Sequence, residues 1–214
     1  MHVIEVLTGE VHAGRTGDVL KASAIGSCIA LSFYCLSRKL GAMAHIMLPG
    51  SCPPGMVDGR TRYAVQAVDE LLLLLQGGDC CGQKIEACLV GGANVLKNED
   101  GLIAKNNLDS VVEILREKKI VFRAQAVGGT ARRSATFNVG LGSVFFTEGD
   151  GEEQFLWAAD ERGMRLWIEE LEQVKSELKR SIGDHRKVRD ALREKVHFLE
   201  EKLRTLEAHK EPGE

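Results

Sequence analysis

A cysteine and a histidine near the start of the chain are the residues whose types could carry chemistry. Cys28 follows Gly26 and Ser27 and precedes an apolar run, Ile29–Tyr34, and His45 lies in a second apolar run. An imidazole that takes the proton of a neighbouring thiol produces a thiolate, which is a strong nucleophile. The small residues before the cysteine favour this interpretation, because they let backbone approach a ligand closely. The alternative is that the cysteine is a small buried hydrophobe and the histidine a core residue.

The two apolar runs predict an antiparallel hairpin that positions this pair. Its turn is expected to be centred between Leu36 and Ser37, at the start of a polar segment. With that centre, Cys28 lies directly opposite His45, on the same face of the sheet and with Cβ atoms about 4.5–5.5 Å apart. A shift of one residue in this register would place the two side chains on opposite faces.

Four motifs of the sequence resemble those of the CheD family of chemoreceptor glutamine deamidases. They are Ala24–Leu31 around the cysteine, Gly41–Pro49 around the histidine, Gly91–Asn94 (Gly-Gly-Ala-Asn) and Gly128–Ser134 (Gly-Gly-Thr-Ala-Arg-Arg-Ser). The motifs stand in family order, and the resemblance covers about residues 3–147. It implies an α/β fold, in which a layered sandwich of mixed β-sheets is flanked by two helices.

The resemblance also implies an activity and the residues that carry it. Members convert glutamines of methyl-accepting chemoreceptors to glutamate in bacterial chemotaxis, and hydrolysis of glutamyl methyl esters is a related activity. On the matching positions, Cys28 is the nucleophile, His45 is the base, and backbone N–H groups around Ser27 are candidates to hold the oxyanion. Candidate supporting residues are Ser23, Gly26, Ser27, Gly128, Gly129, Arg133 and Ser134. Chemoreceptors are the implied substrates, and a CheC-type phosphatase is a further candidate partner.

Three features of the sequence depart from the family pattern and define a second function class. The threonine usual six residues before the cysteine is Ala22, and the acidic residue usual before the second glycine pair is Ala126. The usual Gly-x-Arg-Asn motif reads Ala104–Asn107 and keeps only its last residue. Ser23, Ser27 and Thr130 are candidates to replace the threonine. The alternative to an enzyme is therefore a catalytically weakened binding module that engages receptors or CheC-type partners.

The remaining patterns predict two helices and a series of short strands. The helices are Thr61–Gln76, with one apolar stripe, and Leu108–Lys118, capped by Asn106 or Asn107. Besides the hairpin, we expect strands at residues 3–7, around 11, 19–23, 85–90, 120–127, 135–139 and 143–147. This irregular order favours a mixed sheet. The loop Pro49–Gly59 follows the histidine strand and could cover the site.

Composition excludes several other classes of protein. The net charge of −3 and the pI near 6.1 provide no basic field for nucleic acid. The longest leucine run, Leu71–Leu75, is too short to span a bilayer, and the first residues lack a signal-peptide pattern, so we expect a cytoplasmic protein that is not membrane-inserted. The six cysteines show no metal-ligand spacing, and Cys80 and Cys81 lie in a glycine-rich loop. We expect no disulfide, no metal and no cofactor.

The end of the chain predicts a separate helical element. We expect a deamidase-like domain at residues 1–148, a polar linker at 149–163 and a helical extension at 164–214. Two apolar seams have heptad-like spacing: Trp167, Leu171, Val174 and Leu178, then Val188, Leu192, Val196, Leu199, Leu203 and Leu206. Gly183 and Asp184 suggest a helical hairpin, or one kinked helix, that forms a coiled coil. It is a candidate element for homodimerisation or for docking a partner.

Overall fold

The chain divides into two units, residues 1–160 and residues 161–214. The computed structural model of the protein describes residues 2–76, 85–97, 102–180 and 186–208. The first unit contains both β-sheets and the first two helices, and the second unit contains two further helices. All residues of the candidate site therefore belong to the first unit.

Sheet A is a mixed sheet of five strands in the order β1, β3, β8, β9, β10. Its first strand runs parallel to the second, and the other pairs are antiparallel. The strands are β1 (His2–Glu5), β3 (Asp18–Ile25), β8 (Arg133–Asn138), β9 (Ser143–Glu148) and β10 (Gln154–Ala158).

Sheet B also has five strands, in the order β2, β5, β4, β6, β7. Only β6 and β7 run parallel within it. The strands are β2 (Val11–Gly14), β5 (Leu40–Ile46), β4 (Ile29–Cys35), β6 (Ile85–Gly91) and β7 (Val121–Val127). Every residue of the central β4 is buried, since other layers cover both of its faces.

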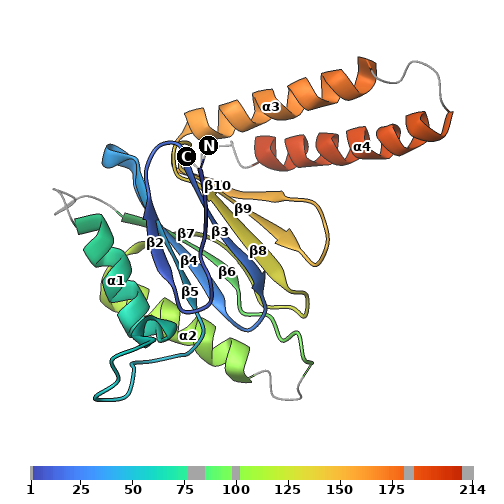
Figure 1. Ribbon diagram of the computed structural model, residues 1–214. Helices are drawn as coiled ribbons and strands as arrows, with labels where there is room; N and C mark the ends of the chain where they lie inside the picture. The colour runs from blue at the N-terminus through green and yellow to red at the C-terminus, as the bar shows by residue number, and fades with distance from the viewer. Residues whose placement is uncertain (1, 77–84, 98–101, 181–185, 209–214) are drawn as a thin grey trace. The chain divides into compact units, whose positions relative to one another are not determined.

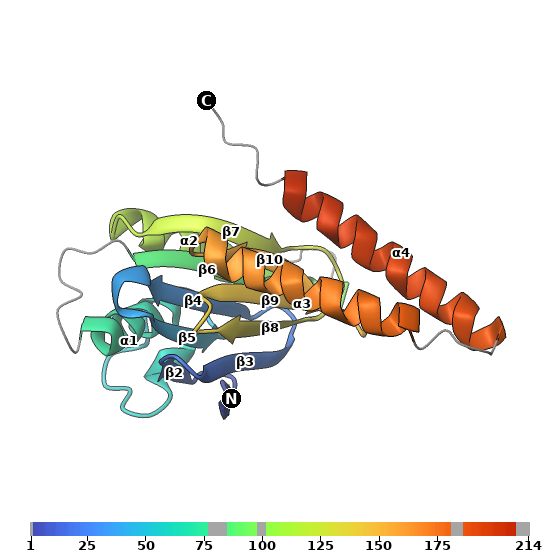
Figure 2. The ribbon, with the colours of Figure 1, turned by 90° about the horizontal axis from the view of Figure 1, so that it is seen from above.

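The first unit consists of three layers: two helices, sheet B and sheet A (Figures 1 and 2). The helices α1 (Ala64–Gln76) and α2 (Leu102–Glu117) pack on one face of sheet B through a core that includes Leu31, Phe33 and Leu71. A second core fills the space between the two sheets and includes residues of β3, β4, β5 and β8. The structure confirms the predicted α/β class with two mixed sheets.

The first helix agrees with the sequence prediction, and the second begins earlier than predicted. A short 3₁₀ turn, Arg60–Arg62, precedes α1, whose buried residues lie on the expected stripe. The second helix starts at Leu102, so Asn106 and Asn107 lie inside it and the predicted cap is wrong. Asparagine is a poor helix former, but here one asparagine side chain forms tertiary hydrogen bonds that no local pattern reveals.

The segment expected to be a linker contains a strand. Gln154–Ala158 forms β10, which pairs with β9 and completes sheet A. The first unit accordingly extends to Asp160 and not to residue 148. The polar stretch at the start of this segment hides the strand, because only the four apolar residues from Phe155 to Ala158 carry a strand signal.

The second unit contains two helices that contact each other, α3 (Glu161–Arg180) and α4 (Arg186–Ala208). An ion pair joins Lys175 to Glu200 at 3.0 Å. Leu199 is buried, as its place in the predicted seam requires, whereas Val174 is exposed. Gly183 and Asp184 lie outside the described residues. Coiled-coil packing and dimerisation through these helices stay predictions.

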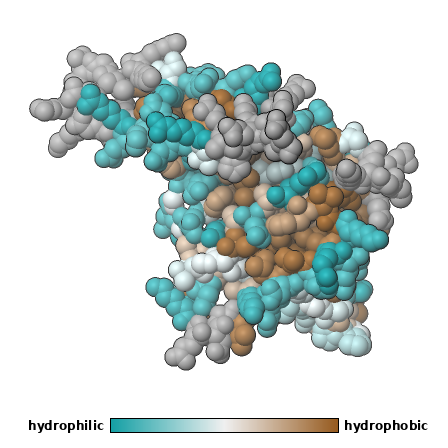
Figure 3. All heavy atoms as spheres, turned by 180° about the vertical axis from the view of Figure 1, so that it is seen from behind, coloured by the Kyte–Doolittle hydropathy of each residue, from teal (hydrophilic) through white to brown (hydrophobic). Residues whose placement is uncertain are grey.

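The described residues also bear on the membrane and cysteine predictions. Within them, no helix is long and apolar enough to span a membrane. Of the described cysteines, Cys28, Cys35, Cys52 and Cys88, none is in a disulfide bond, and Cys80 and Cys81 lie outside the described residues. Seen from behind, hydrophobic residues gather over the middle of the β-sandwich (Figure 3). Phe122, on the edge strand β7, is among the exposed large hydrophobic residues.

Candidate active site

The predicted hairpin exists, but its register differs from the prediction by two residues. His45 pairs with Ala30, so it does not lie directly opposite Cys28. The reason is the turn: a 3₁₀ turn, Leu36–Arg38, is followed by Lys39 in the left-handed conformation, which moves the centre of the hairpin by one residue. Moving the centre by one residue shifts the partner of every residue by two positions. Because side chains alternate with a period of two, Cys28 and His45 stay on the same face.

Cys28 and His45 therefore lie diagonally across the hairpin, on the face that points toward sheet A. Cys28 lies in the bend immediately before β4 and packs against the core between the sheets, to which Ala30 and Met43 also belong. Alternation along β5 places His45 on the same face as Met43. Diagonal neighbours in a β-ladder are typically about 7–8 Å apart. The sheet thus brings a thiol and an imidazole to one face of the sandwich.

The imidazole of His45 is buried and oriented by the backbone of the N-terminal segment. Its exposed fraction is 4%, and Nδ1 lies 3.3 Å from the carbonyl oxygen of Val6. That carbonyl accepts, so Nδ1 carries the proton and Nε2 is left with a lone pair. The same segment pairs with the His45 backbone, because Gly9 N–H donates to its carbonyl and its N–H donates to Glu10. Among the described residues, Nε2 has no hydrogen-bond partner.

The loop that carries Cys28 is fixed by the glycine motif at the end of β6. The Gly92 N–H donates to the Cys28 carbonyl and the Ala93 N–H donates to the Gly26 carbonyl, both at 2.8 Å. Gly91 has φ of +124°, and a Cβ atom there would overlap the Cys28 carbonyl oxygen. Only glycine fits this position. The motif therefore serves to dock the loop that carries the thiol.

A second glycine pair lies beside the first. The Gly128 N–H donates to the Gly91 carbonyl at 3.0 Å, and Gly129 accepts from the Asn94 N–H at 2.9 Å. Both glycines have positive φ, of +78° and +70°, so the loop adopts a conformation that other residues rarely take. The second pair supports the first, and neither contributes a reactive side chain.

Arg133 supports this second loop from within the sandwich. It is buried, donates from Nη1 to the Gly128 carbonyl at 2.6 Å and pairs through Nη2 with Glu148 at 2.8 Å. A buried guanidinium needs such partners, because an unpaired charge there costs several kcal/mol. Arg133 thus holds the Gly128 loop in place. It supports the cysteine loop only indirectly, because the Gly128 loop bonds to Gly91 and the adjacent Gly92 bonds to Cys28.

Burial keeps both members of the candidate pair neutral in the resting protein. It raises the pKa of the Cys28 thiol, and the N–H of Cys28 itself opposes this rise only in part. It lowers the pKa of the His45 imidazole, and the hydrogen bond to Val6 opposes this change. The neutral thiol and imidazole are therefore favoured over the thiolate and imidazolium.

Alkylation of the free protein tests this protonation state. We expect the rate at which iodoacetamide labels Cys28 to keep rising with pH beyond about 8.5, the ordinary pKa of a thiol. Mass spectrometry of the Cys28 peptide across a pH series measures this rate, and the free thiol of Cys52 in the same molecule provides a reference. A rate that levels off below about pH 7.5 would instead indicate a preformed thiolate and imidazolium pair.

The structure does not bring the other predicted polar residues to the cysteine. Ala22 is buried in the core between the sheets and pairs with Ala135. Ser23 is exposed and points to the outer face of sheet A, and alternation from the buried Ala135 places Ser134 on that face as well. Thr130 is exposed in its loop. Of the candidates for the usual threonine, only Ser27 lies in the loop that carries the cysteine.

The sequence patterns do not predict the contacts that two residues, Val6 and Asn107, make with the site. Val6 acts through its carbonyl, and its backbone N–H is anchored to Lys21 at 2.7 Å, so its side-chain type carries no signal. Asn107 donates to the Ser27 and Met47 carbonyls, at 2.9 Å each. A signal for Asn107 exists in the sequence: it lies on the same stripe as the buried Ala104, Val111, Ile114 and Leu115, where an apolar residue is expected.

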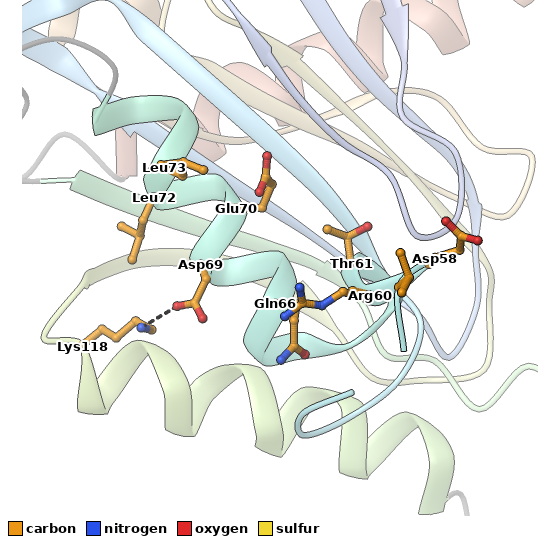
Figure 4. A pocket seen from close by; sticks show the side chains of 11 residues that line it. Asp58, Arg60, Thr61, Gln66, Asp69, Glu70, Leu72, Leu73 and Lys118 are labelled. Atoms are coloured by element: carbon orange, nitrogen blue, oxygen red, sulfur yellow. Dashed lines mark ion pairs between the residues drawn. The ribbon is translucent and has the colours of Figure 1, made fainter. Parts of the chain in front are cut away.

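A pocket of the first unit lies away from the candidate pair. A hollow of about 730 Å³ lies beside α1 and is lined by residues including Asp58, Arg60, Gln66 and Lys118, with Lys118 paired to Asp69 at 2.7 Å (Figure 4). Cys28 and His45 do not line it. The start of the loop predicted to cover the site is tied instead to the helices, since Gly50 N–H donates to Ser110.

A family model described as CheD chemotactic sensory transduction matches residues 47–148. This match contains both glycine pairs and Asn107, and it begins two residues after His45.

Comparison with curated proteins extends the similarity. The probable chemoreceptor glutamine deamidase CheD of Chlorobium luteolum is 35% identical over 156 residues, covering 73% of this chain and 77% of the relative. The chemoreceptor glutamine deamidase CheD of Thermotoga maritima is 31% identical over 146 residues, covering 68% and 92%. That of Halalkalibacterium halodurans is 30% identical over 141 residues, covering 64% and 87%. With these motifs, this fold and these relatives, the chain belongs to the CheD family.

Proposed function

We propose that this protein is a glutamine deamidase that acts on chemoreceptors, with Cys28 as its nucleophile and His45 as its base. Family membership and the names of the relatives support the reaction. The observation that carries the assignment of residues is a buried imidazole with an unpartnered Nε2 on the same face as the cysteine. No metal or cofactor takes part in the proposed reaction.

In the first half of the reaction, the thiol displaces ammonia from the glutamine side chain. His45 Nε2 accepts the thiol proton while the sulfur attacks the carboxamide carbon, which gives a tetrahedral oxyanion. The oxyanion collapses, the C–N bond breaks, and the imidazolium returns its proton to the departing nitrogen. The products of this half are ammonia and a thioester between Cys28 and the substrate.

In the second half, water releases the product. His45 Nε2 accepts a proton from water as the oxygen attacks the thioester carbon, and collapse of the second intermediate breaks the C–S bond. The imidazolium protonates the leaving sulfur, which restores the thiol. The net change is addition of water and loss of ammonia, so glutamine becomes glutamate.

Backbone groups of the cysteine loop are the candidates to stabilise both oxyanions. The carbonyls of Gly26, Ser27 and Cys28 all accept hydrogen bonds from the body of the protein. These bonds hold the backbone of the loop in place, and the N–H groups of the loop are the candidates to donate to the substrate oxygen. Stabilisation of an oxyanion by such donors is usually the largest single contribution to acyl-transfer catalysis.

The surface beside the loop suits an apolar segment of a substrate. Met47, Val95 and Leu96 are exposed large hydrophobic residues, and Leu96 is 79% exposed. Val95 packs near Gly26, since a Cβ atom added to Gly26 would lie 3.3 Å from Cγ2 of Val95. Apolar side chains at this position favour a substrate that presents a glutamine next to an apolar helical face. Each deamidation would add one negative charge to that helix and change its pairing with neighbours.

A second candidate function is a binding module with weak catalysis. It is favoured by Ala22, whose buried methyl group provides no hydrogen bond where family members usually have a threonine. Ala126, half-buried on β7, likewise replaces an acidic residue. Loss of an orienting group can cost orders of magnitude in rate.

Incubation of the purified protein with cytoplasmic fragments of chemoreceptors distinguishes the two functions. Ammonia release and peptide mass spectrometry are followed together, and the expected result is conversion of defined glutamines to glutamate with matching ammonia. Binding without turnover would replace the deamidase by the binding module. Neither binding nor turnover with any receptor fragment would contradict both.

A further inference from the structure

One side chain of α2 connects the two backbone segments that carry the candidate pair. The Nδ2 of Asn107 donates to the carbonyl of Ser27, the residue before the cysteine, and to the carbonyl of Met47, two residues after the histidine. Both distances are 2.9 Å. A single amide therefore spans the start of β4 and the end of β5, which are the two ends of the hairpin.

The orientation of this amide is determined by its partners. Both partners are carbonyl oxygens, which only accept, so the amide must present its NH₂ group to them. Asn107 is fully buried, with 0% exposure, and its Oδ1 has no partner among the described residues. A buried polar atom without a partner costs about 1–3 kcal/mol. The protein retains this asparagine although its position lies on the apolar stripe of the helix.

The two hydrogen bonds act at the point where the hairpin needs support. The last ladder pair between the strands is Ile29 with Ile46, so Ser27 and Met47 lie beyond the ladder. Gly92 and Ala93 hold the cysteine loop from the side of β6. The Asn107 side chain bonds both to this loop and to the continuation of the histidine strand.

We propose that Asn107 is a positioning residue that sets the distance between the Cys28 thiol and the His45 imidazole. This inference rests on the proposed function for its effect on turnover, but the geometry itself is independent of any substrate. Asn107 touches neither reacting group, and acts by fixing the carbonyls that flank each of them. A displacement of about 1 Å between reacting groups can cost on the order of 10²-fold in rate.

A double-mutant cycle between Asn107 and His45 tests the proposal without a receptor. In the wild-type background at neutral pH, we expect His45→Gln to slow alkylation of Cys28 by iodoacetamide, because Nε2 accepts the thiol proton as the sulfur attacks the reagent. In the Asn107→Leu background, which removes both hydrogen bonds at similar volume, the same change should have less than about a third of that effect, because the pair is already separated. Asn107→Ala repeats the cycle if the leucine variant does not fold, as judged by circular dichroism.

Asn106 provides the matched control, since it is the same residue type, next in sequence and exposed. Asn106→Leu should leave the effect of His45→Gln unchanged. On receptor fragments, Asn107→Leu should lower kcat by about 10–100-fold and change KM less than about twofold. Equal effects of His45→Gln in both backgrounds would overturn the positioning role, whereas a reduced effect without any deamidation would retain it and contradict only the proposed function.

Discussion

Replacing Cys28 by alanine should abolish deamidation of receptor fragments, with a fall in kcat of at least about 10⁴-fold. The proposed reaction proceeds through a thioester, and the other thiol described at this face of the sandwich, Cys88, is buried in the core between the sheets with 2% exposure. Serine at the same position should be almost as inactive, because a hydroxyl is a far weaker nucleophile beside a neutral imidazole. Ammonia release and conversion of the target glutamine are measured for each variant.

Cys52 is the control for this substitution. It is also a half-buried free thiol, and it lies in the loop whose contacts go to α1. Cys52→Ala should therefore deamidate at the wild-type rate. Conversion of glutamine by the Cys28→Ala protein, at more than about a hundredth of the wild-type rate, would rule out the thiol mechanism, given how much removal of a nucleophile ordinarily costs.

Replacing His45 by glutamine should lower kcat by about 10²–10⁴-fold, the range in which general base catalysis contributes. Glutamine can keep the hydrogen bond to the Val6 carbonyl, but its amide cannot accept a proton from the thiol. Because His45 is buried without a partner for Nε2, the variant should also fold stably. Single-turnover kinetics separate the slowed thioester formation from any change in substrate binding.

His12 provides the comparison for this second variant. It lies on β2, paired with Met43 of the same strand that carries His45, and its side chain is part-exposed and bonded to Glu10. His12→Gln should retain kcat within about twofold, as expected for a surface substitution. If both histidine variants lost the same activity, the loss would reflect strand β5 and not a base.

The hairpin shows how far sequence alone can reach at this site. Two apolar runs and a polar turn predict the strands, and the structure confirms both. The exact register depends on the turn conformation, in which Lys39 adopts a positive φ that no sequence rule requires. The error amounts to two residues in the pairing, and because side chains alternate with a period of two, the chemical prediction of a shared face is unaffected.

The sequence patterns do not predict contacts between distant segments. The Val6 carbonyl reaches His45 because β1 is placed beside β3 and the following segment crosses to β5. A backbone carbonyl leaves no trace in residue types. Asn106 or Asn107 is predicted as a helix cap for the opposite reason: the residue type is typical of a cap, whereas in the structure the Asn107 side chain bonds two carbonyls far away in sequence.

The sequence predicts the role of the glycine pairs only in part. Glycine type correctly indicates a tight turn or close backbone approach at Gly91, and the structure identifies the approaching atom as the Cys28 carbonyl oxygen. The glycines are predicted as candidate supporting residues of the site. In the structure, their backbone hydrogen bonds support the cysteine loop. Glycine type alone does not predict which backbone segment comes close, because that depends on the tertiary structure.

In the proposed mechanism, the support of the cysteine loop also determines when catalysis can begin during synthesis. The loop depends on Gly91, on Asn107 and, through the Gly128 loop and Arg133, on Glu148. A ribosome adds about 5–20 residues per second, so on the order of 10 s separates the appearance of Cys28 from that of the last of these residues. For most of that interval the nascent chain carries both Cys28 and His45, but without the contacts that hold the cysteine loop. In the proposed mechanism, amide hydrolysis therefore starts only after these supporting residues have been synthesised.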